Sequence, residues 1–525
     1  MAERVIDTIS AAARGETAWR PSAWLAVPLL ALTFGIAHAQ YPLYYLTQNQ
    51  YFFHGLMRAG AGLLRQDWLA GTADPWPLFS GLVELTARFL NSGAFYIYYL
   101  ALLGVYAYSI LGIVTPLFGL DRSRSRYLAT LVLLMGLHAP LTAAVLERVF
   151  GVEDGKELLV GGVALQRILW DMFQPGAFGV FLLLSIYLFV RKRPFWAVAA
   201  AAFAASVHPT YMVSAGVLML SYVIILASQR QGLRRTLTVA AWAAVSMLPV
   251  VLYMVVTFRP TSPEISRQAF VILVGALSRH AVIAEWFDVT VVAKIVIIGT
   301  ALTLVRRTAL FWVMAISAAV ATGLTLVQVL TGSNQLALIY PWRLSVYLVP
   351  LSTVIVAALL LSRVLNWLER RAPASRIAVP AISVALIVAL MGAGAWETAR
   401  RRNFLVSTRE EPVPLYRFVR GSKGPDRVYL IPPKWRYFRL YTGAPVFTDS
   451  RFSPYKDTEV LEWQRRVRIA EAFYAASGDR HCQTLAAMPT RLRPTHAVVS
   501  AAAFPRCGWT LEFDGGEYRV FRLPR

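Results

Sequence analysis

Long apolar runs, separated by short polar connectors, cover most of this chain. A helix needs about 20 mainly apolar residues to cross a bilayer, because the backbone groups of an open structure find no partners in hydrocarbon. The pattern therefore predicts a polytopic α-helical membrane protein with about eleven spans. The predicted spans are residues 22–40, 94–118, 127–149, 174–190, 195–208, 210–228, 236–257, 287–305, 308–331, 344–362 and 376–396.

Two short runs on either side of His208, Pro209 and Thr210 allow a second interpretation, a single long helix. At about 1.5 Å per residue, that helix would overshoot a hydrocarbon core of about 30 Å and would place one basic cluster on each side of the membrane. The pattern thus favours a helical hairpin that turns at His208 near the outer surface.

Every second connector is short and basic. Lys and Arg are retained on the cytoplasmic side of membrane proteins, so eleven spans that start inside place the C-terminus outside. Met1 to Arg20 lacks the pattern of a cleaved signal, and we expect the first span to be an uncleaved anchor. The basic connectors contain Arg122, Arg124, Arg126, Arg191, Lys192, Arg193, Arg234, Arg235, Arg306, Arg307, Arg363, Arg370 and Arg371.

The first connector, residues 41–91, is too long, too polar and too aromatic to serve only as a link. Residues 49–70, NQYFFHGLMRAGAGLLRQDWLA, predict an amphipathic helix, and a second helical run follows the GTADPWP break. Such helices lie in the membrane interface, with Trp and Tyr at headgroup depth. Asp67 and Asp74 are either helix caps, as the proline after Asp74 indicates, or candidates for a catalytic base.

The last quarter of the chain has the pattern of a water-soluble domain. Short β-branched and aromatic runs predict strands, and one longer stretch has helical periodicity. Strands separated by a helix indicate a small α/β domain. The predicted strands are residues 428–433, 444–449 and 496–501, and the predicted helix is residues 458–476.

This change of pattern divides the chain into a transmembrane domain at residues 1–398 and an extracytoplasmic α/β domain at residues 399–525. The two cysteines, Cys482 and Cys507, both fall in the second domain. An oxidising compartment permits a disulfide between them, and two free thiols are the alternative.

The chain has 525 residues, of which 57% are hydrophobic and 15% are charged, and a net charge of +23. In a membrane protein the first explanation of such a charge is retention of Lys and Arg at cytoplasmic helix ends, so we expect no nucleic-acid partner. The sequence contains no Walker loop, no GxGxxG after a strand, no HExxH and no GxSxG. A reaction carried out by this protein must therefore use a substrate that is itself activated, or a gradient.

The connector between the third and fourth runs carries further carboxylates. Asp171 stands in an apolar stretch close to the membrane, where a carboxylate is costly unless it is paired or functional. Arg167, four residues earlier, would pair with it along a helix if its role is structural. Asp154 and Glu157 in the same connector are candidates for a second acidic group.

Histidine and arginine recur in the other outward connectors. His208, Arg279, His280 and Arg343 face the same compartment in the predicted topology. Arginine near the membrane surface suits phosphate through bidentate hydrogen bonds and charge, and anchoring to lipid headgroups is the alternative. For a lone histidine at a membrane edge, satisfied hydrogen bonding is the more frequent role.

Four segments carry a family resemblance: FFHGLMRAGAGLLRQDWLAGTADPWPLFS, SVHPTY, YPWRLS and TDSRFSPYKDTEVLEWQRR. Together with the predicted topology, they resemble bacterial membrane proteins of the GT-C class of integral-membrane glycosyltransferases. The resemblance implies transfer of a sugar from a polyprenyl-phosphate donor to a glycan, lipid or protein acceptor. It places this reaction at the outer face of the cytoplasmic membrane, within cell-envelope polysaccharide biosynthesis.

In that class a carboxylate shortly after the first span serves as base or metal-associated acid. The matching position here reads Gln48, Asn49, Gln50, so the resemblance moves the base to Asp67 or Asp74, with Asp154, Glu157 or Asp171 as its catalytic partner. Arginines, with or without a divalent cation such as Mg²⁺ or Mn²⁺, would stabilise the departing phosphate. The substrate-binding candidates are Asn49, His54, Arg58, Glu157, His208, Arg279, His280 and Arg343.

Two other functions fit the same pattern. A transporter or flippase of a lipid-linked glycan intermediate would place polar residues along several helix interiors, and four of the runs are almost purely apolar. A non-catalytic scaffold in a glycan-assembly complex suits the Gln48 to Gln50 sequence. Convergence of Asp67, Asp74 and Asp171 on one outward cavity lined by arginines would favour the enzyme.

Overall fold

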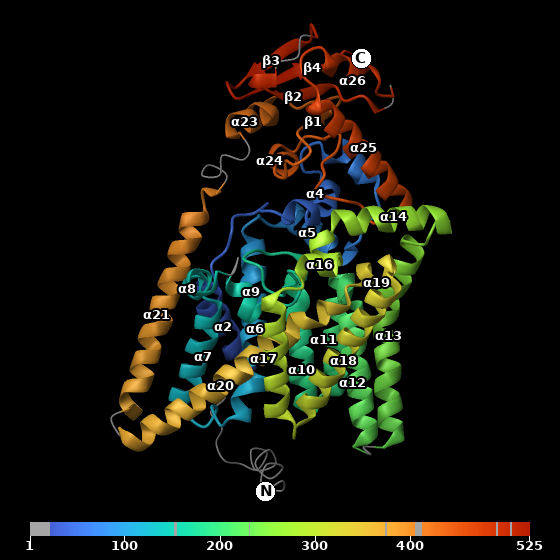
Figure 1. Cartoon of the computed structure of the whole chain (residues 1–525). Helices are drawn as coiled ribbons and strands as arrows, with labels where there is room; N and C mark the ends of the chain where they lie inside the picture. Colours follow the sequence, from blue (N-terminus) through green and yellow to red (C-terminus); the bar gives the residue numbers. More distant parts are fainter. Residues whose placement is uncertain are drawn as a thin grey trace. The chain divides into compact units, whose positions relative to one another are not determined.

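The computed structural model of the chain describes seven stretches of residues, and helices make up most of them (Figure 1). Met1 to Arg20 and Asp154, for which the sequence makes predictions, lie outside these stretches. The described residues are 22–151, 155–229, 232–372, 375–404, 412–489, 492–503 and 507–524.

A helix overlaps each of the eleven predicted apolar runs, and several extend beyond the predicted ends. In chain order these helices are α2 (Ala23–His38), α6 (Ala94–Leu117), α7 (Arg124–His138) with α8 (Pro140–Phe150), α10 (Val180–Val190), α11 (Pro194–Val207), α12 (Met212–Ser228), α13 (Leu233–Thr257), α17 (Val289–Val305), α18 (Ala309–Thr331), α20 (Ser345–Arg371) and α21 (Ser375–Arg401). Within the described ranges, six helices are long and apolar enough to cross a membrane, or seven if the bent pair α7 and α8 forms one span. Because α2, α10, α11 and α17 are shorter, the count of eleven spans stays a prediction.

The third predicted run is a broken helix. α7 ends at His138, and α8 starts at Pro140 after a bend of 57°. Proline lacks a backbone N–H and disfavours helical geometry at the residue before it. Ala139 accordingly has an extended backbone, with φ −68° and ψ 142°, and the sequence pattern of apolar residues alone does not reveal this break.

The described chain divides into two compact units. The helical unit comprises the described parts of Met1–Gln40, Phe95–Val251 and Leu277–Ala399. The mixed unit comprises the described parts of Tyr41–Ala94, Leu252–Ala276 and Arg400–Arg525. The first connector and the C-terminal segment, far apart in sequence, therefore belong to one unit.

Helices of the helical unit pack through small and hydroxyl-bearing side chains. α11 packs on α10, and its buried Ala201 and Ala205 let the two backbones approach closely. Ser185 of α10 and Tyr222 of α12 join their hydroxyls at 2.8 Å. α11 and α12 pack together and meet at His208, so the predicted hairpin is present.

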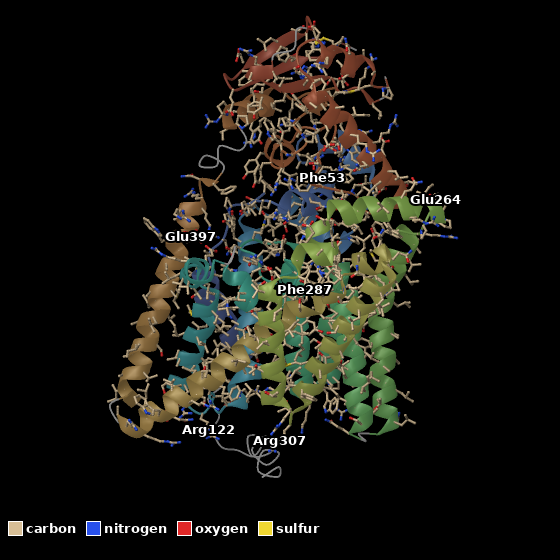
Figure 2. The ribbon with its side chains drawn as sticks, viewed as in Figure 1. Phe53, Arg122, Glu264, Phe287, Arg307 and Glu397 are labelled. Atoms are coloured by element: carbon tan, nitrogen blue, oxygen red, sulfur yellow. A yellow bond between two sulfur atoms is a disulfide. The ribbon has the colours of Figure 1, made fainter. Side chains whose placement is uncertain are left out.

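The outermost helices of this unit expose apolar side chains. Only 17% of the apolar stretch of α13 and of α21 is buried, and Trp396 on α21 is 75% exposed. Arg122 and Arg307 lie at one end of the helical unit and Glu397 lies near the other (Figure 2). An apolar belt between charged ends is the surface that a bilayer requires.

The mixed unit contains a four-stranded sheet of order β1-β2-β4-β3, in which only the β1–β2 pair is parallel. Alternate residues of the sheet face two apolar clusters. Val498 and Val520 pack with α23, while Ala497 and Phe521 pack with α25 and α26. These elements are β1 (Tyr429–Leu430), β2 (His496–Ser500), β3 (Thr510–Asp514), β4 (Tyr518–Arg522), α23 (Val413–Ser422), α24 (Phe438–Thr442), α25 (Asp457–Ala475) and α26 (Arg480–Ala486).

The sequence predicts part of this sheet. Residues 428–433 and 496–501 contain β1 and β2, whereas residues 444–449 add only one isolated bridge. The prediction missed β3 and β4. Their hairpin has a turn signal, because the side chain of Asp514 accepts the N–H of Gly516 at 3.0 Å in an Asp-Gly-Gly sequence.

Residues 49–70 do not form the single amphipathic helix that the sequence predicts. The helix ends near Arg58 because Gly60 and Gly62 have φ values of 81° and 55°. A Cβ on Gly62 would lie 2.5 Å from the carbonyl oxygen of Gly443, so this close approach requires glycine. The elements here are α3 (Gln48–Tyr51), α4 (Phe53–Arg58), η1 (Leu64–Gln66), η2 (Trp68–Gly71) and the predicted second run, α5 (Pro77–Phe89).

Asp457 joins α25 to the segment that leads into α14 (Pro263–Ala276). Its carboxylate accepts the backbone N–H and the hydroxyl of Thr261 at 2.7 and 2.8 Å, and the hydroxyl of Ser266 at 2.8 Å. Burial raises the pKa of Asp457, but the hydrogen bonds outweigh it and hold the pKa below its usual value. The contact therefore stabilises fully above about pH 3.9, and this contribution is lost as pH falls towards the folded pKa.

Cys482 and Cys507 form a disulfide, with Cα atoms 5.6 Å apart and a sequence separation of 25. Replacing both with serine should destabilise the mixed unit by about 3 kcal/mol, because a cross-link of this loop length restricts the unfolded chain. Thermal unfolding of the purified full-length protein measures the loss. Alkylation without reductant should leave both wild-type cysteines unlabelled, and labelling of either would contradict the disulfide.

Asp457→Asn should loosen α14 and remove the acid dependence of this contact. Hydrogen exchange of the full-length protein, corrected for the intrinsic rate, should show α14 protected at pH 7 and less protected near pH 3.5 in the wild type, roughly at the carboxyl pKa. The variant should show weak protection at both values. Asp514→Asn is the matched control, and equal protection of α14 in wild type and Asp457→Asn at pH 7 would contradict the assignment.

Candidate functional site

One connector of the helical unit, residues 161–174, lies next to several of the predicted site residues. It joins α9 (Gly155–Val160) to η3 (Pro175–Gly179), which leads into α10. Ala164 and Leu165 have left-handed φ values of 57° and 56°, which are uncommon for residues with side chains. Such a backbone persists only where surrounding contacts hold it.

Lys294 and Ser345 supply these contacts. The Nζ of Lys294 donates to the carbonyl of Gly162 at 2.7 Å, and the hydroxyl of Ser345 accepts the N–H of Val163 at 2.7 Å. Lys294 is buried within the apolar helix α17, where an ammonium without a partner is costly. The carbonyl offsets part of that cost, so the helix and the connector hold each other in place.

Arg343 lies in η5 (Pro341–Leu344), directly before α20. Its Nη1 lies 3.4 Å from Nε2 of His208 and donates to the hydroxyl of Thr210 at the hairpin turn. The rings of Tyr211 and Tyr340 are 5.3 and 5.8 Å from the guanidinium carbon, within cation–π range. These partners of the guanidinium, an imidazole, a hydroxyl and two phenol rings, are all neutral.

Arg343 has no acidic partner within the part of the chain that the structure describes. Among the described residues, no carboxylate forms an ion pair with it, and its Nε is buried without a hydrogen-bond partner. The side chain as a whole is half-buried, so solvent screens its charge only in part. A planar, uncompensated guanidinium in such surroundings is suited to a phosphate or another oxyanion.

His280 approaches the same connector. Its Nδ1 donates to the carbonyl of Ala164 at 2.8 Å. Burial lowers the pKa of His280, that carbonyl opposes the shift, and the charges of Arg343 and the exposed Arg279 lower the pKa further. His280 is neutral at pH 7, so the positive charge beside it belongs to the arginines.

Asp171, in the same connector, pairs with a residue that the sequence does not indicate. Its Oδ1 lies 3.4 Å from Nε2 of His38, at the end of α2. Arg167, the sequence candidate for this pairing, forms an ion pair with Glu157 instead. The Asp171 side chain is 17% exposed and His38 is 2% exposed, so the carboxylate is the accessible member of the pair.

A second histidine lies beside this pair. The ring centres of His38 and His138 are 6.2 Å apart. The Nδ1 of His138 contacts the carbonyl of Leu134 at 2.9 Å, and its Nε2 contacts the hydroxyl of Tyr106 at 2.9 Å. Since a carbonyl only accepts, the Nδ1 carries the proton and the Nε2 accepts from Tyr106.

Asp67 lies at the centre of a buried ion-pair network in the mixed unit. Its Oδ2 accepts from Nε of Arg439 at 2.8 Å and from the N–H of Val446 at 2.9 Å, and its Oδ1 caps η2 through the N–H of Leu69. Arg439 also donates to Asp449 at 2.6 Å. Burial opposes the charge of Arg439, but the two carboxylates raise its pKa above the usual value. The geometry supports the cap interpretation of Asp67.

Asp74 belongs to a separate cluster of the same unit. It pairs with Arg58 and accepts the N–H of Trp76 at 2.9 Å. The Nδ1 of His54 lies 3.9 Å from its Oδ1. Burial lowers the pKa of His54 against the opposing charge of Asp74, so the ring is neutral at pH 7. His54 and Trp76 also line a crevice with a volume of about 10 Å³, room for about one water molecule.

The candidates from the sequence thus fall into three groups. Around the 161–174 connector lie Glu157, Asp171, His208, His280 and Arg343, with Arg279 exposed beside them. In the mixed unit, Asp74, His54 and Arg58 form one cluster, and Asp67 lies in the network of Arg439. Asn49 donates to the carbonyl of Leu46 at 3.0 Å and fixes the start of α3.

Sequence reasoning missed His38, Lys294 and Arg439. Lys294 has a recognisable signal, because a single cation inside an apolar run needs a partner or a function. His38 is the last residue of α2, and only the fold shows which carboxylate it meets. Arg439 has no local signal at all.

A metal ion has no evident site in the described ranges. No group of three or more His, Cys, Asp or Glu side chains is placed there to hold one. The two carboxylates nearest the 161–174 connector are already paired, Glu157 with Arg167 and Asp171 with His38. The predicted divalent cation, Mg²⁺ or Mn²⁺, stays a prediction.

Comparison with known proteins adds three findings. The model of a domain of unknown function (DUF6798) matches residues 411–470, which include Arg439, Asp449 and Asp457. No curated protein sequence matches the chain. The chain is similar to the crystal structure of ArnT from Cupriavidus metallidurans bound to undecaprenyl phosphate, with 14% identity and a TM-score of 0.39 over 95% of this chain and 96% of that chain.

Arg439→Leu should destabilise the mixed unit by about 3–5 kcal/mol, because it leaves Asp67 and Asp449 buried without their counter-charge. Thermal unfolding of the purified full-length protein measures this loss. The triple variant Asp67→Asn, Arg439→Leu, Asp449→Asn should recover part of it, since the unpaired charges are then gone. Arg465→Leu, an exposed arginine of α25, is the control. A triple variant less stable than Arg439→Leu would contradict the ion-pair explanation.

Proposed function

We propose that this protein is a membrane glycosyltransferase that moves a sugar from a polyprenyl-phosphate donor to an acceptor at the outer face of the bacterial cytoplasmic membrane. The observation that carries the proposal is Arg343, half-buried among neutral partners and without an acidic one among the described residues. A donor of this kind is already activated, which suits a sequence without nucleotide-binding motifs.

In this proposal Arg343 binds the donor phosphate. The guanidinium offers two N–H groups in a plane to a phosphate, and the rings of Tyr211 and Tyr340 limit its rotation. Because the site is partly shielded from water, the attraction grows as negative charge develops on the leaving phosphate. The exposed apolar faces of the helices suit the polyprenyl chain, which stays in the bilayer.

Asp171 is the proposed base. In the reaction, the acceptor hydroxyl gives its proton to Asp171, and its oxygen forms a bond to the anomeric carbon of the donor sugar. The bond from that carbon to the phosphate oxygen breaks, and its electron pair leaves with the polyprenyl phosphate beside Arg343. His38 orients the carboxylate at 3.4 Å. A positioned base contributes roughly 10²- to 10⁴-fold to such a step.

The mechanism assigns no step to a metal ion, since the paired carboxylates of the helical unit offer no ready ligand set. A bound Mg²⁺ or Mn²⁺ would supply further charge for the leaving phosphate. Asp74, next to neutral His54, is the competing base in the mixed unit. Asp67 is assigned no chemical role, because its side chain is fully buried in the Arg439 network.

Binding of undecaprenyl phosphate to the full-length protein in detergent, followed by native mass spectrometry, tests the phosphate site. Arg343→Gln should weaken binding roughly 10- to 100-fold, the range expected for lost hydrogen bonds to a charged group. Arg343→Lys should lose less, and the exposed control Arg465→Gln on α25 should bind like the wild type. Unchanged binding by Arg343→Gln would overturn the proposal.

Sugar transfer in proteoliposomes tests the base, with radiolabelled polyprenyl-phosphate sugars and membrane extract as the acceptor source. Asp171→Asn should bind undecaprenyl phosphate within two-fold of wild type and lose transfer by about 10²-fold or more. If Asp74→Asn loses transfer and Asp171→Asn keeps it, the base lies in the mixed unit and the assignment to Asp171 is wrong.

A further inference from the structure

A basic cavity lies in the mixed unit, apart from every residue used above. It has a volume of about 270 Å³, and Arg402, Arg417 and Arg420 line it together with Tyr416 and Tyr441. None of its lining residues is acidic. Three arginines converge here on one open space.

The arginines reach the cavity from two segments. Arg417 and Arg420 are three residues apart on α23, so they share one face of the helix. The Nε of Arg420 donates to the carbonyl of Tyr441 at 3.0 Å, which fixes that guanidinium at the wall. Within the described residues, no carboxylate forms an ion pair with any of the three. Their charges are therefore available to a ligand.

The cavity is linked to the membrane through the chain itself. Arg402 directly follows α21, an apolar helix of which 17% is buried and whose Trp396 is 75% exposed. Just past the end of an apolar span, the chain reaches headgroup depth, where aromatic and basic residues gather. Basic and aromatic residues do gather here. The guanidinium carbon of Arg401 lies 4.0 Å from the ring centre of Tyr41, and the ring centres of Tyr41 and Tyr45 are 3.8 Å apart in a stacked arrangement.

We propose that this cavity binds the phosphate of an anionic phospholipid headgroup, with the acyl chains remaining in the bilayer. Three arginines and two tyrosine rings match a phosphate diester that carries one negative charge beside an apolar glycerol backbone. A free phosphate shares the same oxyanion chemistry, but the direct chain connection from the apolar helix α21 to Arg402 favours a lipid. The site is independent of the proposed transferase reaction, since it uses none of the residues assigned to that reaction.

The test uses the full-length protein in zwitterionic detergent, with native mass spectrometry to count bound lipid. The probes are dioleoyl phosphatidylglycerol, dioleoyl phosphatidylcholine and inorganic phosphate. Phosphatidylglycerol should bind more tightly than either of the others. Removing an arginine near a headgroup weakens binding about five-fold, so Arg402→Gln with Arg417→Gln should weaken phosphatidylglycerol binding roughly 25-fold.

The matched control removes two exposed arginines elsewhere in the mixed unit, Arg465→Gln with Arg480→Gln, and should bind like the wild type. Phosphatidylglycerol binding that is equal in the cavity variant and the control overturns the site. Equal binding of phosphatidylglycerol and phosphatidylcholine overturns recognition of the anionic headgroup. Inorganic phosphate that competes at the same concentration as the lipid overturns the lipid as occupant and leaves a soluble-anion site.

Discussion

The free-energy cost of burying a charge is the constraint that shapes the 161–174 connector of the helical unit. Lys294 lies inside an apolar helix, and the carbonyl of Gly162 offsets part of the cost by accepting a hydrogen bond from its ammonium. That bond fixes the connector that carries Asp171 and offers the carbonyl of Ala164 to His280. Lys294, a single cation in an otherwise apolar run of the sequence, thus helps to fix the backbone of the 161–174 connector.

Two arginines show opposite solutions to the same constraint. The charge of Arg439 is compensated by Asp67 and Asp449, so it offers no net attraction to a ligand anion. This network stabilises the fold. Among the described residues, Arg343 instead contacts the neutral groups of His208 and its neighbours. Two arginines of one chain therefore differ in how their charge is compensated, which residue type alone does not reveal.

Hydropathy located the helices of the helical unit because lipid acts on each run separately, whatever its neighbours. The breaks at Ala139 and Gly60 depend on single backbone conformations and were harder to predict. Candidate site residues were recognisable by type, but their partners were not. Asp67 meets an arginine 372 positions away, and His38 meets a carboxylate in a distant connector, so only the fold brings these pairs together.

Tyr340 has a left-handed backbone, with φ 54° and ψ 67°, directly before a proline. For a residue with a side chain, this conformation is disfavoured by roughly 1–2 kcal/mol, and glycine would adopt it freely. Selection for stability alone would therefore replace this tyrosine. Its ring lies 5.8 Å from the guanidinium carbon of Arg343 and forms a cation–π contact with it that glycine would not form. A glycine introduced here to raise the melting temperature would therefore remove one of the contacts that hold Arg343.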